Sequence, residues 1–191
     1  MDGSKFNIPD ISDLPDKAVS CFLARSIGGS IQKKPKNVQG ALSVLARLID
    51  KAKMEYLLVR EAILEDEKEG KLTYEDLVIR GQGQFFFTVT IINNLENCIN
   101  TLSRIYKVIT IINEEHQSAH KKPVIEIRNS IEHINERIIR DVKGALSLII
   151  SGDDLVAEIT GQQINFVNLA SEIKLNYIVI MQCLQSEESP V

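Results

Sequence analysis

The sequence contains no tryptophan, and phenylalanine and tyrosine together make up only 5% of it. Proteins that bind single-stranded nucleic acid without sequence preference use aromatic side chains as stacking platforms, and no such platform is expected here. The formal net charge is -4, which argues against a protein that holds a long DNA by neutralising many phosphates. A nuclease whose site is basic only locally remains compatible with this charge.

Cysteine and long apolar runs are also scarce. The three cysteines, Cys21, Cys98 and Cys183, lie far apart without C-x-x-C spacing, so we expect reduced thiols in the core. The chain begins Met1-Asp2-Gly3-Ser4, without a basic start or an apolar segment, which predicts no secretory signal. Its apolar runs last only a few residues, which predicts no transmembrane helix. These features indicate a cytoplasmic protein with no membrane partner.

A chain of 191 residues with 44% hydrophobic content is long enough for one packed domain. Prolines and the pair Gly28-Gly29 interrupt the first 36 residues. We therefore expect residues 1–36 to form an extended N-terminal arm with one short helix over 18–26. Residues 37–184 should form the helical domain, and residues 185–191 a frayed tail.

Apolar residues recur at helical spacing over most of the domain. Asn37 is the expected N-cap of a first long helix, and a second is expected to run through residues 92–109. Pro123 is placed for the first turn of a third helix over 124–143. A last helix is predicted over 168–184.

The pattern changes between the third helix and the last. Residues 146–150, 155–159 and 163–167 have the character of short strands, separated by turn-forming residues at 152–154 and 161–162. The sequence therefore predicts a mainly α fold. We expect an antiparallel bundle of four to five helices with a small β hairpin or meander near residues 146–167.

The third predicted helix carries the most informative motif, Arg128-Asn129-Ser130-Ile131-Glu132-His133. Arginine holds phosphate through a planar fork of donors, and histidine can transfer protons near pH 7. On a helical wheel, Ile127 and Ile131 fall on the core stripe, whereas Asn129 and His133 fall opposite and Arg128 lies at one edge. We therefore expect His133 to lie outside the core.

This segment resembles the R-x4-6-H motif of the HEPN superfamily, in which an arginine followed by a polar residue precedes a histidine. The resemblance implies a metal-independent endoribonuclease without a cofactor, acting in a toxin system or in phage defence. Arg128 would bind the scissile phosphate, Asn129 would orient groups in the cleft, and His133 would act as general acid or base. The implied partners are an RNA substrate, a second copy bound through the motif helix and, in a toxin system, an antitoxin protein. The 2′-hydroxyl of RNA would be the nucleophile, and the product would carry a 2′,3′-cyclic phosphate.

A second interpretation belongs to a different class. The chain could be a non-catalytic helical dimer that binds a protein or nucleotide, with an exposed polar stripe laced by i,i+4 pairs such as Arg128 with Glu132. The acidic neighbours Glu132 and Glu136 in the motif helix would repel RNA and favour the protonated form of His133. Convergence of Arg128 and His133 from two chains on one cleft would favour the nuclease, whereas separated or salt-bridged side chains would favour the binding module.

One weaker signal is the H-x-x-x-H spacing of His116 and His120, which on a helix could present two metal ligands. The pair lies in a polar segment between predicted helices and lacks the intervening glutamate of H-E-x-x-H hydrolases. We therefore expect a solvated loop there and no metal site.

Overall fold

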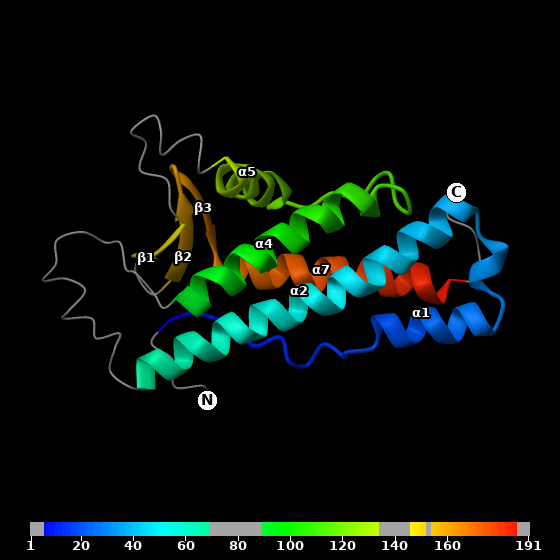
Figure 1. Cartoon of the computed structure of the whole chain (residues 1–191), viewed down its shortest axis with the longest axis horizontal. Helices are drawn as coiled ribbons and strands as arrows, with labels where there is room; N and C mark the ends of the chain where they lie inside the picture. Colours follow the sequence, from blue (N-terminus) through cyan, green and yellow to red (C-terminus); the bar gives the residue numbers. More distant parts are fainter. Residues whose placement is uncertain (1–5, 69–88, 134–145, 152–153, 187–191) are drawn as a thin grey trace, which may run out of the picture.

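A computed structural model describes residues 6–68, 89–133, 146–151 and 154–186. The elements, in chain order, are α1 (Ala18–Ile27), the 3-10 helix η1 (Ile31–Lys33), α2 (Lys36–Lys68), α4 (Val89–Ile109), α5 (Lys121–Glu132), β1 (Ser147–Ser151), β2 (Asp154–Ile159), β3 (Gln162–Asn165) and α7 (Phe166–Gln185). Figure 1 shows a helical bundle with a small sheet at one end, which confirms the predicted mainly α fold. None of the helices in these ranges has the length and apolarity needed to cross a lipid bilayer.

The bundle is built on α2, which runs antiparallel to α4 and α7 (Figure 1). The helix α2 begins at Lys36, so Asn37 lies in its first turn and is not the N-cap that we expected. Apolar side chains recur every three or four residues and are buried along the inner face of α2, among them Val38, Leu42, Leu45, Ile49, Ala52, Tyr56, Val59 and Ile63.

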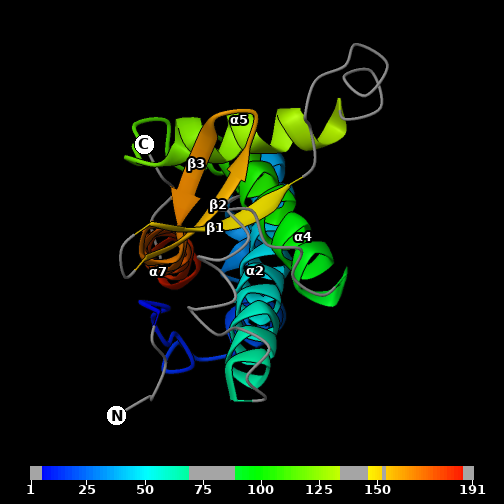
Figure 2. The ribbon, with the colours of Figure 1, turned by 90° about the vertical axis from the view of Figure 1, so that its left-hand side faces the viewer.

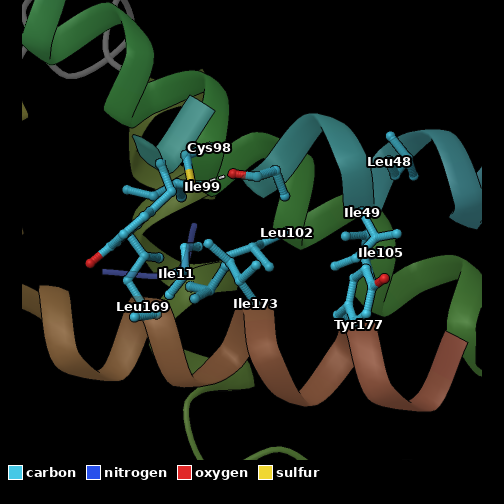
Figure 3. Close-up of a cluster of buried hydrophobic side chains, with 14 of the residues drawn as sticks. Ile11, Leu48, Ile49, Cys98, Ile99, Leu102, Ile105, Leu169, Ile173 and Tyr177 are labelled. Carbon is cyan, nitrogen blue, oxygen red and sulfur yellow. Dashed lines mark hydrogen bonds between the residues drawn. The ribbon is translucent and has the colours of Figure 1, made fainter. Parts of the chain in front are cut away.

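The core lies where α2, α4 and α7 face one another. Figure 3 shows side chains from the three helices meeting there, including Ile49 of α2, Leu102 of α4 and Ile173 of α7. Burying one such side chain contributes about 1.5–3 kcal/mol to the hydrophobic stabilisation. All three cysteines are free thiols, with Cys98 buried in the core and the other two partly buried, as predicted.

The sheet is an antiparallel meander in the order β1-β2-β3. Residues Ile159 and Gln162 pair across β2 and β3, so the connection is a two-residue turn formed by Thr160 and Gly161. The third predicted strand, 163–167, was partly wrong, because α7 begins at Phe166. Its N-cap is Asn165, whose side-chain oxygen accepts a hydrogen bond of 2.8 Å from the backbone N–H of Asn168.

The described part of the N-terminal segment packs against α2 and contributes to the core. Phe6, Ile8 and Ile11 are buried, and the Tyr56 hydroxyl donates a hydrogen bond of 2.9 Å to the carbonyl oxygen of Pro9. The short helix expected over 18–26 is α1.

The start of α1 is fixed by a residue from another helix. The Asp50 carboxylate of α2 accepts hydrogen bonds from the backbone N–H groups of Ala18 (3.3 Å) and Val19 (3.1 Å). An acidic group is stabilising at this position because a helix N-terminus carries partial positive charge. The carboxylate therefore joins the N-terminal segment to the bundle.

The buried N-terminal segment generates a prediction about stability. Ile11→Ala should lower the free energy of unfolding by about 2–5 kcal/mol, because it leaves a cavity at a fully buried position. The matched control is Leu23→Ala in α1, where the side chain is 53% exposed and the loss should be within about 0.5 kcal/mol. Urea denaturation at pH 7 measures both. Equal small losses would contradict the packing of this segment.

Candidate functional site

The motif lies in the last turn of α5 and the residue that follows it. The helix begins at Lys121, earlier than predicted, with Pro123 in its first turn as expected. It ends at Glu132, and His133 is its C-cap. Residues 134–143 of the predicted helix lie outside the described residues.

The exposure of the motif side chains follows the helical wheel. Ile127 is fully buried and Ile131 is partly buried against the core, whereas Asn129 and His133 are exposed. Arg128 is intermediate, as expected for a residue at the edge of the stripe. The prediction that His133 lies outside the core is confirmed.

The Arg128 guanidinium contacts two side chains of its own helix. One of its terminal nitrogens donates a hydrogen bond of 3.1 Å to the Asn129 side-chain oxygen, and another forms an ion pair with the Glu132 carboxylate. This is the i,i+4 pair that the second interpretation anticipated. The Glu132 side chain is 46% exposed, and surface pairs of this kind contribute only about 0.3–0.5 kcal/mol.

The N-terminal end of α5 is anchored by a buried carboxylate. Glu172 of α7 is 2% exposed and accepts hydrogen bonds from the Tyr106 hydroxyl (2.5 Å), the Ser118 hydroxyl and the backbone N–H of His120 (3.2 Å). His120 is the N-cap of α5. One carboxylate of α7 therefore connects α4, the segment before α5 and the N-cap residue of α5.

The C-terminal half of α5 rests on the β2-β3 hairpin. Figure 2 shows the closed end of this hairpin against the helix. Ser130, which is 3% exposed, places its hydroxyl 3.2 Å from the hydroxyl of Thr160 in the hairpin turn. The helix that carries the motif is thus held near both ends.

His116 and His120 do not lie on a helix, and the expectation of a solvated loop was wrong for His116. His116 is buried, and the Glu172 carboxylate lies near enough to act on its imidazole electrostatically. Burial lowers the pKa of His116 below its ordinary value, which outweighs the opposing effect of the nearby Glu172 carboxylate. In the ranges that the structure describes, no group of three or more His, Cys, Asp or Glu side chains is placed to hold a metal ion.

Sequence reasoning missed Glu172, Asn176 and Thr160 as residues around the site. Glu172 carried a signal, because it is the one acidic residue in the segment 166–185 and directly precedes the core position Ile173. A lone carboxylate next to core positions predicts either a buried polar network or an exposed helix face. Only the hydrogen-bond partners in the folded chain distinguish a buried network from an exposed helix face. The partners Tyr106 and Ser118 are more than 50 residues away from Glu172 in the sequence.

Comparisons with protein-family models, with curated proteins and with solved structures find no match for this chain.

The Glu172 network generates a second stability prediction. Glu172→Ala should lower the free energy of unfolding by about 2–4 kcal/mol, because it leaves the buried donor of Tyr106 and the partly buried donors of Ser118 and His120 without this acceptor. Glu172→Gln should cost less, because its side-chain oxygen can still accept hydrogen bonds. Chemical denaturation of the two variants tests this order. Equal losses would show that the carboxylate is not the shared acceptor.

The pKa of His116 predicts a pH dependence. Because the unfolded chain binds a proton at His116 more readily than the folded chain, stability should fall as pH drops from about 6.5 towards the lowered pKa. His116→Gln removes this titration, so its loss of stability between pH 7.5 and pH 5 should be smaller than that of the original chain. Denaturation curves at several pH values provide the test, with His120→Gln as the control. Parallel pH profiles for all three proteins would contradict the assignment.

Proposed function

We propose that this chain is a metal-independent endoribonuclease of the HEPN type. One observation carries the proposal: Arg128, Asn129 and His133 lie at one end of α5 with His133 and Asn129 exposed and Arg128 at their edge. The guanidinium of Arg128, which can bind a phosphate, and the imidazole of His133, which can transfer a proton, thus lie at the same end of the helix. They sit on a helix whose two halves are anchored by α7 and the sheet, which meets the need for rigid support of a catalytic group.

Under this proposal, the 2′-hydroxyl oxygen of RNA attacks the adjacent phosphorus, and the bond from phosphorus to the 5′-oxygen breaks. One imidazole removes the 2′ proton, and another protonates the leaving 5′-oxygen. The products are a 2′,3′-cyclic phosphate and a 5′-hydroxyl. Each His133 of a homodimer would take one of these two roles, and Arg128 would stabilise the charge that develops on the phosphoryl oxygens.

The Arg128 guanidinium is paired with Glu132, so a bound phosphate would have to replace this carboxylate. An exposed i,i+4 pair is weak, whereas a phosphate can accept charge-assisted hydrogen bonds from two nitrogens of the same guanidinium. Substrate can therefore displace Glu132 at small cost. A setting in a toxin system or phage defence, with an antitoxin protein as partner, forms part of the same proposal.

The first experiment is RNA cleavage in EDTA by the purified chain and by His133→Ala and Arg128→Ala. We expect cleavage that leaves 2′,3′-cyclic phosphate and a rate at least about 100-fold lower in each variant, because general acid-base catalysis contributes about 10²–10⁴. The control is His120→Ala at the other end of α5, because the hydrogen bond of His120 to Glu172 comes from its backbone N–H, which the substitution keeps. End-group analysis of the fragments identifies the chemistry.

A second candidate function is favoured by the ion pair itself. In a non-catalytic dimer that binds a protein or nucleotide, the polar end of α5 would be a solvated surface stabilised by the Arg128–Glu132 pair. The cleavage experiment separates the two functions. An intact, folded dimer that leaves RNA uncut, with no difference between the original chain and His133→Ala, would overturn the nuclease proposal in favour of binding.

A further inference from the structure

The first residue of the β2-β3 turn, Thr160, adopts a backbone conformation that is unfavourable for a β-branched side chain. Thr160 has a φ of 52°, and in the described part of the chain it is the one residue other than glycine with a positive φ. Gly161, the second turn residue, has a φ of 80°. A two-residue hairpin turn of type I′ has positive φ at both positions, and asparagine, aspartate or glycine usually occupies the first. A β-branched threonine there is strained, because its side chain crowds the backbone.

Backbone strain at one residue persists only when its surroundings hold it, and it is concentrated at functional sites. Here the surroundings include the motif helix. The Thr160 hydroxyl lies 3.2 Å from the Ser130 hydroxyl, and Ser130 is the residue after Asn129 within the motif. Ser130 is buried and Thr160 is exposed, so this hydrogen bond is partly shielded from competing water.

The contact is placed where it can fix the orientation of the motif side chains. Ser130 points into the protein from the last turn of α5, while Asn129 and His133 of the same stretch are exposed. The backbone N–H of His133 donates to the carbonyl oxygen of Asn129 at 3.1 Å, which ties the histidine to that turn. A restraint on Ser130 is therefore also a restraint on the backbone from which His133 extends.

We propose that Thr160 is a positioning residue, which acts through Ser130 to hold the last turn of α5 in the geometry that the proposed ribonuclease reaction needs. This inference rests on the proposed function. The hydroxyl contact with the motif helix accounts for a threonine at this strained position of the turn. Catalytic groups displaced by about 1 Å can lose about 100-fold in rate, so a restraint of this kind has a measurable effect.

The test compares Thr160→Gly, Thr160→Ser and Ser130→Ala with the original chain. Thr160→Gly relieves the strain and removes the hydroxyl, so its melting temperature should stay equal or rise while kcat falls about tenfold or more and KM changes by less than about twofold. Thr160→Ser keeps the hydroxyl and should retain kcat within about threefold. Ser130→Ala should lower kcat as Thr160→Gly does. A purely structural role for Thr160 would not reduce kcat in a variant that is as stable as the original chain.

A second readout separates this inference from the proposed function. Amide hydrogen exchange at residues 129–133, measured by NMR without RNA, should be faster in Thr160→Gly and Ser130→Ala and unchanged in Thr160→Ser. If the original chain does not cleave RNA, the nuclease proposal fails, and this exchange pattern alone decides whether the turn holds the motif helix. Unchanged exchange in all variants would overturn the inference, as would Thr160→Gly with full kcat.

Discussion

The placement of α5, and with it the motif, depends on the buried carboxylate of Glu172. A buried charge is costly unless hydrogen bonds satisfy it, and here donors come from Tyr106, Ser118 and the backbone of His120. These donors belong to α4, to the connection after it and to the start of α5. A position for α5 that separated His120 from α7 would remove one of these donors from the buried carboxylate. The network therefore specifies where the helix begins, in addition to any stability that it contributes.

The two anchors of α5 come from one short stretch of chain. Thr160 lies in the turn between β2 and β3, and β3 continues directly into α7, which carries Glu172. Asn165 makes this continuity possible, because it caps α7 at the point where the strand ends. The hairpin turn therefore contacts the C-terminal half of α5, and the Glu172 carboxylate contacts the N-terminal end of α5. Both contacts come from one continuous stretch of β2, β3 and α7. This arrangement gives the small sheet a physical role, since it supports the motif helix.

Local patterns in the sequence predicted the fold class, the short helix α1, the last helix and the exposure of His133, because periodic burial determines each of them. The boundary between β3 and α7 was missed because Phe166 and Val167 are apolar and strand-like, whereas the cap at Asn165 overrides that preference. The burial of His116 and the support of the motif by Thr160 were beyond local reasoning. His116 interacts with residues of α7 that are more than 50 positions away, and Thr160 meets Ser130 only after the hairpin packs on α5.

The charges at the motif constrain how the proposed site would recognise RNA. Arg128 is neutralised locally by Glu132, and the whole chain carries a net charge of -4, so a single chain offers little long-range attraction to a polyanion. Affinity must then come from short-range contacts, in which two guanidinium nitrogens of Arg128 replace Glu132 with a phosphate. A second chain that presents its own Arg128 at the same phosphate would double those contacts without adding to the long-range field. Under the proposed function, a site completed by two chains would offer both Arg128 side chains to one phosphate.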